Sequence, residues 1–208
     1  MSDSNDSGET ANLLRAVADG DSASLQRLLE LHRPYLKRVV QMRMDPALAA
    51  RIDPSDVVQE AQVVIFKRID DFIERKPVSF RLWIRHQTLE CLIDQHRRHV
   101  TAKKRSVLRE RELANTSSLA IARKLFSDSP SSIVRRLELR DQVMEAIEQL
   151  SANDREVLSL RHAEGLSNLE VAELLDLDPN TVRQRYGRAL RRLYQRLSEN
   201  QISFDGMQ

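Results

Sequence analysis

The sequence predicts an all-α protein with two small helical domains joined by a flexible linker. Five glycines and six prolines among 208 residues are too few turn formers for a β-sandwich, barrel or propeller. Charged residues make up 31% of the chain, apolar residues 41% and aromatic residues only 4%, which suits several amphipathic helices around modest cores. Between residues 106 and 132 the helical period weakens and serines crowd together, so the regular segments fall into two blocks.

The cysteine count and the lack of long apolar runs limit the compartment and the chemistry. Cys91 is the single cysteine, so the chain can form no internal disulfide and no cysteine-based zinc site. The first residues show neither the basic nor the apolar region of a signal peptide, and no apolar run approaches the ~18 residues of a membrane span. We therefore expect a soluble, cytoplasmic protein that does not bind membranes.

The first domain is expected at residues 11–104, after an acidic disordered tail at residues 1–10. Its first helical block, residues 11–44, carries two apolar stripes separated by a turn at residues 19–21. Pro34 lies inside the second stripe. It should kink or split that helix, because proline removes a hydrogen-bond donor and clashes with the preceding turn.

Two further helices are expected in the same domain. Asp53 suits an N-cap and Pro54 the first helical position, so a helix should begin there and continue to about residue 69. Residues 70–79 lose the helical period and are expected to form a loop. Ser79 can then cap a long helix that runs into a basic stretch.

The second domain is expected at residues 137–198. A linker at residues 105–136 precedes it and a C-terminal tail at residues 199–208 follows it. Three capped helices follow one another closely in this domain. Their start signals are Ser151, the capping box of Ser167 with Glu170, and Asp178 followed by Pro179. Two short helices joined by a tight turn, the second of them basic, predict a helix-turn-helix.

The third of these helices divides into a packing side and a polar side. The packing side carries Val182, Tyr186, Ala189, Leu190, Leu193 and Leu197. The opposite side carries Asn180, Gln184, Gly187, Arg188 and Arg191, with Thr181 and Arg183 at its margins. Asn, Gln and Arg can make bidentate contacts with base edges in a major groove. Gly187 costs about 1 kcal/mol against alanine in a helix interior, and either close approach to DNA or a tolerated defect would explain it.

The basic residues are unevenly distributed although the net charge is only +2. Residues 95–105 and residues 181–197 are both rich in Lys and Arg and contain no acid. A solvated helix face usually has acids interspersed with its bases. Two separated basic stretches therefore indicate a polyanion that the chain contacts at two places.

Three segments of the sequence carry motifs of one known family. Residues 56–61 read Asp-Val-Val-Gln-Glu-Ala, which resembles the D-L-V-Q-E signature of region 2 in the sigma-70 family of bacterial RNA polymerase sigma factors. Phe80-x-x-Trp83-Ile84, followed by Asp94-x-x-Arg97-Arg98, is similar to the F-x-x-W-L and D-x-x-R-R run of the same region. Residues 149–193 resemble region 4. A region 2, a linker and a region 4 without a region 3 form the layout of the extracytoplasmic-function (ECF) group.

The resemblance implies a function and a set of contact residues. The protein would direct core RNA polymerase to promoter DNA and assist its opening. Residues implied to bind core polymerase are Asp56, Val57, Gln59 and Glu60. Residues implied at the minus-10 element are Phe72, Phe80, Arg81, Arg85, Arg97, Arg98 and Lys103, although Phe80 and Trp83 suit a packed core at least as well. Residues implied at the minus-35 element are Asn180, Thr181, Arg183, Gln184, Arg188 and Arg191.

The resemblance also implies an anti-sigma factor as a candidate partner, although no residue identifies one. The chain departs from the family pattern at Glu90, where Asn is frequent, at Asp176, where Gly is usual, and at Gly187, where a larger residue is common. We expect no catalytic residue, no metal and no cofactor. His86, Glu90 and Asp94 are metal-ligand types on one helix face, but they span about 12 Å, too far for one ion without a partner helix.

Two other function classes fit part of the pattern. A stand-alone helix-turn-helix regulator would bind duplex DNA by itself at paired half-sites. A helical adaptor that binds only protein would leave both basic stretches unexplained. A sigma factor should instead bind DNA weakly alone, because its two DNA-contacting domains need the polymerase to fix their separation.

Overall fold

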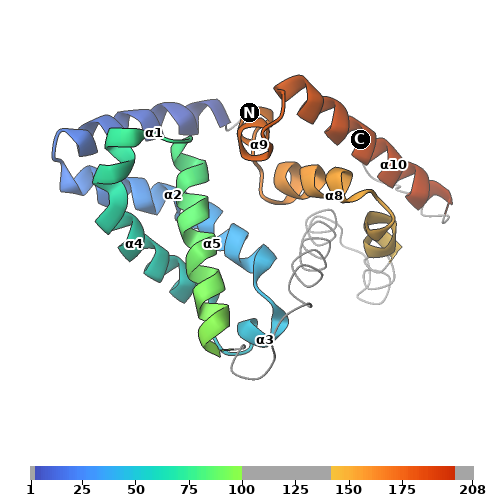
Figure 1. The fold of residues 1–208 in the computed structure, drawn as a ribbon, viewed down its shortest axis with the longest axis horizontal. Coiled ribbons are helices and arrows are strands. Elements are labelled where there is room, and N and C mark those ends of the chain that lie inside the picture. Colours follow the sequence, from blue (N-terminus) through green and yellow to red (C-terminus); the bar gives the residue numbers. More distant parts are fainter. Residues whose placement is uncertain (1–2, 100–141, 200–208) are drawn as a thin grey trace. The chain divides into compact units, whose positions relative to one another are not determined.

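The computed structural model describes residues 3–99 and 142–199 of the chain, and these are helical apart from turns and short connections (Figure 1). The expected all-α class is confirmed. The chain forms two compact units, Met1–Arg109 and Glu110–Gln208, each with its own core. The expected linker, residues 105–136, and almost all of the C-terminal tail lie outside the described residues. None of the helices in the described ranges is long and apolar enough to cross a membrane.

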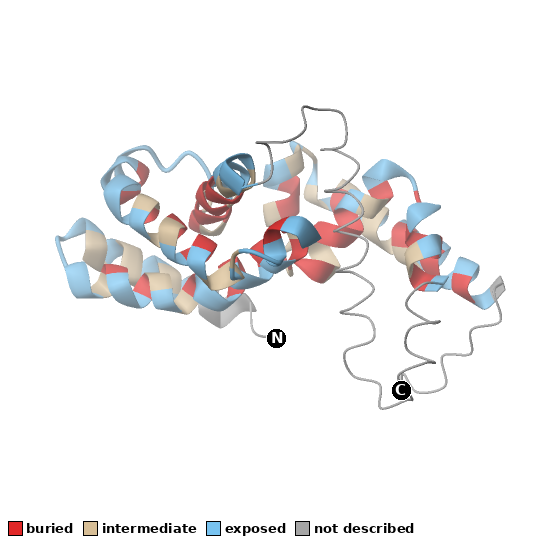
Figure 2. Cartoon of the chain, turned by 90° about the horizontal axis from the view of Figure 1, so that it is seen from below, coloured by how far each residue is buried: buried red, intermediate tan, exposed pale blue. Residues whose placement is uncertain are grey.

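The first unit is a helical bundle built around its second helix. Its elements are α1 (Asp3–Ala18), α2 (Ser22–Arg43), the short α3 (Pro46–Ala49), α4 (Pro54–Arg75) and α5 (Phe80–His99). Helix α2 packs against α1, α4 and α5, and α4 packs along α5. Helices α2, α4 and α5 each carry buried residues where they pack together, and Figure 2 shows buried residues on one side of most helices and exposed residues on the other. Fully buried side chains in this core include Leu28, Leu36, Leu48, Ile65 and Ile84.

Helix α1 starts earlier than the sequence indicated. It begins at Asp3, so it covers most of the segment 1–10 that was expected to be disordered. The physical reason is tertiary packing along α2. Thr10 Oγ1 lies 3.0 Å from His32 Nε2, and Glu9 lies 3.9 Å from the Arg27 guanidinium, so the middle of α1 is held against α2. Weak local preference is overridden by such contacts.

Helix α2 continues through Pro34, so the expected split is wrong. Pro34 is exposed, and the carbonyl of Glu30 that loses its helical donor belongs to another exposed residue, where water can satisfy it. Leu28 on one side of the proline and Leu36 on the other are both fully buried. These anchors hold the two halves of α2 in one helix.

Helix α4 begins as the sequence predicted and ends later. Asp53 Oδ1 accepts a hydrogen bond of 2.7 Å from the Ser55 N–H, which confirms the N-cap, and Pro54 is the first helical residue. The helix then runs to Arg75, so the expected loop at residues 70–79 is wrong for its first six positions. Lys76, with φ 40°, ends the helix in the left-handed conformation.

An aromatic cluster explains the longer α4. The Phe72 ring lies 4.7 Å from Trp83 and 5.4 Å from Phe80, centroid to centroid, and His32 lies 5.3 Å from Phe80. Phe72 continues the buried stripe of Ile65 and Ile69, so burial extends the helix over residues 70–75. The Trp83 N–H donates 3.0 Å to the Ser79 carbonyl, and α5 therefore starts where expected.

The second unit contains the predicted helix-turn-helix. After a helical stretch at residues 142–148 come α8 (Ala152–Leu158), the π-helical turn η1 (Ser159–Ala163), α9 (Asn168–Leu175) and α10 (Pro179–Glu199). The predicted caps are confirmed. Ser151 Oγ accepts from the Asp154 N–H at 3.2 Å, and Ser167 and Glu170 form the complete capping box. Asp176 takes the left-handed conformation, with φ 52°, in the turn before α10.

Replacing Phe72 with alanine should lower the free energy of unfolding of the first unit by about 3–5 kcal/mol, because it removes a buried ring and leaves a cavity. Urea unfolding followed by fluorescence of Trp83, the single tryptophan, measures this. Phe66→Ala is the matched control. It removes a ring from the same helix at a side chain that is 60% exposed, so it should stay within about 0.5 kcal/mol. Equal losses for both variants would contradict the assigned core.

Candidate nucleic-acid interfaces

Helix α10 is fixed in the second unit by its start and by its apolar side. Asp178 Oδ1 accepts a hydrogen bond of 2.8 Å from the Asn180 N–H, which caps the helix. The buried side chains of α10 are Val182, Ala189, Leu193 and Leu197. The helix packs against α8 and α9 through this side. Among the residues that the structure describes, the opposite side of α10 takes no part in this packing.

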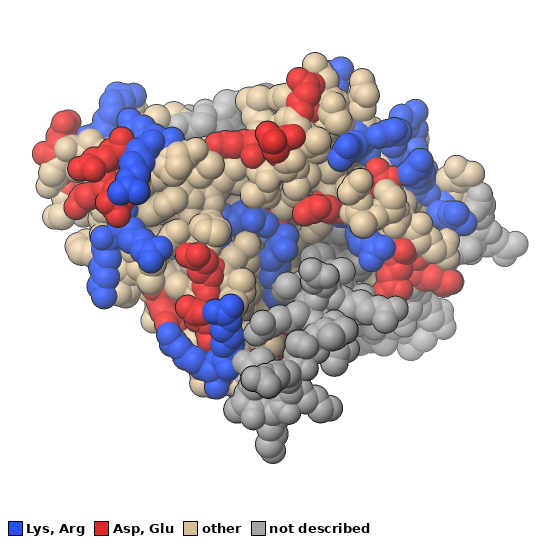
Figure 3. All heavy atoms as spheres, in the orientation of Figure 1, with Lys and Arg blue, Asp and Glu red and all other residues tan. Residues whose placement is uncertain are grey.

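The exposed side of α10 carries the residues expected at the minus-35 element. Asn180, Arg183, Gln184, Arg188 and Arg191 are exposed and Thr181 is half-buried. Lys and Arg atoms line this helix in the space-filling view (Figure 3). We call this side the reading face of α10. Its amides and guanidinium groups are of the types that recognise base edges and phosphates.

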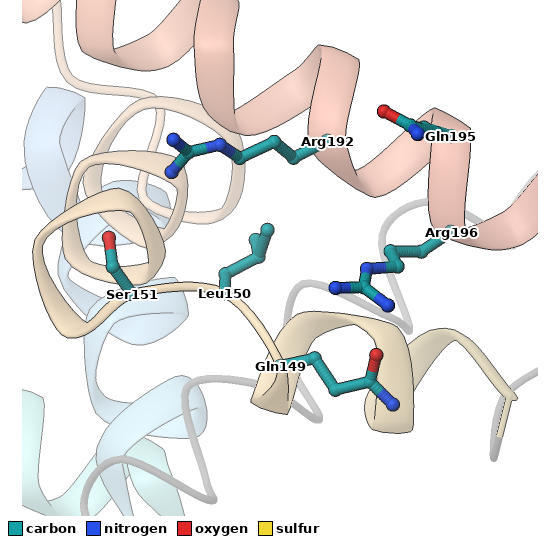
Figure 4. Close-up of a pocket in the computed structure, with 6 residues that line it drawn as sticks. All are labelled: Gln149, Leu150, Ser151, Arg192, Gln195 and Arg196. Carbon is teal, nitrogen blue, oxygen red and sulfur yellow. The ribbon is translucent and has the colours of Figure 1, made fainter.

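Two other arginines of α10 turn toward other parts of the second unit: Arg192 toward α8, and Arg196 toward Gln149, which precedes α8 (Figure 4). Arg192 forms an ion pair with Asp154, whose side chain is only 6% exposed. Arg192 and Arg196 line a hollow of about 420 Å³ with Gln149, Leu150, Ser151 and Gln195 (Figure 4). The basic stretch of the sequence is therefore divided by the fold, because an acid 38 positions away in the chain pairs with one of its arginines.

The C-terminal end of α5 is held by polar contacts to the preceding elements. Both carboxylate oxygens of Glu60 are bonded, one to Gln95 Nε2 and the other to the Arg98 guanidinium at 3.1 Å. His96 Nε2 lies 2.9 Å from an Asp45 carboxylate oxygen. Lys and Arg atoms are accordingly mixed with Asp and Glu atoms at this end of α5 (Figure 3). The glutamate thereby sets the position of an expected DNA-contacting arginine.

The residues expected at the minus-10 element do not form one exposed surface. Phe72 and Phe80 are 4% and 5% exposed, so their rings belong to the core and are not available to a base in this structure. The aromatic cluster accounts for their burial. Arg85 is also buried. The remaining expected residues divide as follows: Arg81 is half-buried with its guanidinium 4.2 Å from the Tyr35 ring centroid, Arg97 and Arg98 are exposed, and Lys103 lies outside the described residues.

The expected polymerase contacts on α4 divide in the same way. Asp56 and Gln59 are exposed, whereas Val57 is fully buried and cannot contact a partner without unfolding. Val63 and Phe66 are 55% and 60% exposed, and they follow Gln59 by four and seven residues on the same side of the helix. Neither side chain was expected on this surface from the sequence. The helical period could have identified them, because Val63 and Phe66 are apolar residues outside the buried stripe of α4 to which Ile65 belongs.

The Cys91 thiol is buried, and two of the three candidate metal ligands, His86 and Glu90, contact each other. Burial raises the pKa of the Cys91 thiol to about 11, with a smaller contribution from nearby carboxylates, chiefly Glu60. His86 Nε2 lies 3.4 Å from the Glu90 carboxylate, which Arg68 also approaches at 3.8 Å. Within the described ranges no group of three or more His, Cys, Asp or Glu side chains is placed to hold a metal ion.

Comparison with known proteins shows the family of this chain. Residues 140–193 match the family model described as Sigma-70, region 4. The chain is 30% identical over 181 residues to the ECF RNA polymerase sigma-E factor of Escherichia coli (strain K12), covering 85% of this chain and 88% of that protein. The chain belongs to the ECF RNA polymerase sigma factors. This ECF sigma factor is also 25% identical to the ECF RNA polymerase sigma factor SigW of Bacillus subtilis (strain 168), over 89% of its own length and 95% of SigW.

A solved structure supports the fold of this ECF sigma factor. The structure of CnrH in complex with the cytosolic domain of CnrY aligns with a TM-score of 0.52, at 24% sequence identity. The match covers 92% of this chain and 98% of that chain. The likeness extends over both helical units and confirms the all-α class.

In this sigma factor, Glu60→Ala should lower the stability of the first unit by about 1 kcal/mol, because Gln95 and Arg98 both lose their acceptor at a half-exposed site. Its neighbour Gln59 is exposed, so Gln59→Ala should change the stability by no more than about 0.5 kcal/mol. Urea unfolding of both variants measures the difference. If Glu60→Ala were as stable as Gln59→Ala, the polar contacts to α5 would have no structural role.

Proposed function

We propose that this ECF sigma factor directs core RNA polymerase to specific promoters and assists DNA opening at the start of transcription. The observation that carries the proposal is α10, a capped helix of a helix-turn-helix with exposed Asn, Gln and Arg side chains. The first part of this helix, residues 179–193, lies within the segment that matches sigma-70 region 4. The protein acts in the cytoplasm as a dissociable specificity subunit, and it has no catalytic site, metal or cofactor of its own.

The first unit binds core polymerase through one side of α4. This side presents Asp56 and Gln59 together with the exposed apolar side chains of Val63 and Phe66. An aromatic anchor with polar neighbours is typical of the centre of a protein interface. Glu60 contributes indirectly, by holding Gln95 and Arg98 of α5. Val57 supports the surface from the core.

The two units bind promoter DNA at separate elements. Arg97 and Arg98 at the exposed end of α5, with Arg81 and Lys103, bind backbone phosphates near the minus-10 element. Phe72, Phe80 and Arg85 support this surface from inside the unit, since all three are buried. The reading face of α10 binds the minus-35 element in the major groove. An anti-sigma factor is a further candidate partner, for which no residue of the described chain gives a specific contact.

Co-elution with purified core RNA polymerase on a sizing column at moderate salt tests the proposal. A stoichiometric complex that survives the salt supports it. Tight binding of duplex DNA by the protein alone, with no polymerase complex, would favour a stand-alone helix-turn-helix regulator instead. The double variant Gln59→Ala, Phe66→Ala should weaken polymerase binding about tenfold or more, as expected when an aromatic anchor is lost. Ile93→Ala removes an apolar side chain that is 44% exposed on α5 and should bind like the wild type.

Replacing Arg183 and Arg188 with alanine should lower minus-35-dependent initiation by about a hundredfold, since each lost contact is worth about 1–3 kcal/mol. Binding to core polymerase should not change, because both residues lie on the reading face of α10. Abortive initiation on promoters with and without the minus-35 element measures this. Arg196→Ala removes the same charge from the side of α10 that lines the hollow near Gln149, and should retain most of the activity. Loss of both polymerase binding and initiation in the double variant would point to misfolding.

A further inference from the structure

Neither packing nor backbone conformation within the second unit requires a glycine at position 187 of α10. It is the single glycine of this helix and follows Pro179 by eight residues, far from either end. A Cβ atom added there would meet no heavy atom within 4 Å, so packing does not require glycine. Its φ is not positive, unlike those of Gly20 and Gly165, so the backbone conformation does not require it either. Glycine nevertheless weakens a helix interior more than any residue except proline.

The neighbours of Gly187 on the helix surface are residues of the reading face. It lies on the reading face, four residues after Arg183, three after Gln184 and four before Arg191. The Arg191 Nε atom donates a hydrogen bond of 3.2 Å to the Gly187 carbonyl, so the backbone at this position is open to a group as large as a guanidinium. The middle of the reading face is thus bare backbone between long polar side chains.

We propose that Gly187 is a specificity-determining residue for the minus-35 DNA, an inference that rests on the proposed function. The absence of a side chain lets the α10 backbone lie close to the floor of the major groove. The Asn180 and Gln184 side chains are shorter than those of the neighbouring arginines, so their amides reach base edges only when the helix itself is near the bases. A side chain at position 187 would hold the middle of α10 away from the duplex and loosen these contacts.

The proposal predicts opposite changes in stability and in DNA binding. Gly187→Ala and Gly187→Leu should both raise the unfolding temperature of the second unit by about 4 °C or more, because both residues favour helix over glycine. The affinity for minus-35 DNA should fall about tenfold for the alanine variant and further for leucine. A purely structural role for Gly187 would move stability and binding in the same direction.

Gly8 supplies the matched control. It also lies in a helix, α1, and an added Cβ there would meet nothing within 4 Å. Gly8→Ala should therefore stabilise the first unit and leave DNA binding unchanged. DNA binding is measured for every variant with the full-length protein reconstituted with core RNA polymerase. Unfolding is measured with the same full-length protein without the polymerase. Duplexes with a randomised minus-35 element are first enriched by the wild-type holoenzyme, and the enriched sequence is the probe.

Fluorescence anisotropy with this probe gives the dissociation constants, and calorimetry gives the unfolding temperatures. Weaker binding by the Gly187 variants, together with higher unfolding temperatures, supports the inference. Wild-type affinity for Gly187→Leu would overturn it and leave the proposed function standing. If the wild-type holoenzyme enriched no minus-35 sequence, both the inference and the proposed reading of DNA by α10 would be wrong.

Discussion

The first unit depends on the ring contacts between the end of α4 and the start of α5. Phe72 is the last buried residue of α4, and Phe80 is the first residue of α5. Their contact, with Trp83 beside them, sets how the two helices run past one another. With the two helices side by side, Glu60, in the first part of α4, lies next to Gln95 and Arg98, near the end of α5. A hydrophobic contact thus positions a polar one at the opposite end of the helix pair.

Opposite charges that are distant in the sequence modify both basic stretches. Glu60 pairs with Arg98 and Asp154 pairs with Arg192, so part of the positive charge is neutralised within each unit. Arg97 also lies 3.4 Å from Asp94, one turn before it on α5. The folded surface is therefore less uniformly basic than the linear sequences of residues 95–105 and 181–197 suggest. Such pairing focuses the positive charge on the reading face of α10 rather than over the whole helix.

Local signals were readable from the sequence, whereas long-range packing was not. Asp53, Ser151 and the Ser167–Glu170 capping box satisfy helix ends within three residues, so their roles follow from short spacing alone. The extension of α4 to Arg75 could not be predicted in that way, because it depends on rings supplied by another helix. The reading face of α10 followed from its helical period. The burial of Val57 and Phe72 and the exposure of Phe66 depended on which side of α4 meets its neighbours.

The buried thiol of Cys91 has a practical consequence for experiments on this protein. With a pKa of about 11, only on the order of one thiol in a thousand is ionised at pH 8, against roughly one in four for an ordinary cysteine. Maleimide and disulfide reagents attack the ionised form. A cysteine introduced on an exposed surface of either unit would therefore take up a dye or spin label selectively, with Cys91 left in place. Distances between labelled positions could then be followed in the complex with core RNA polymerase, in a chain whose core is unchanged.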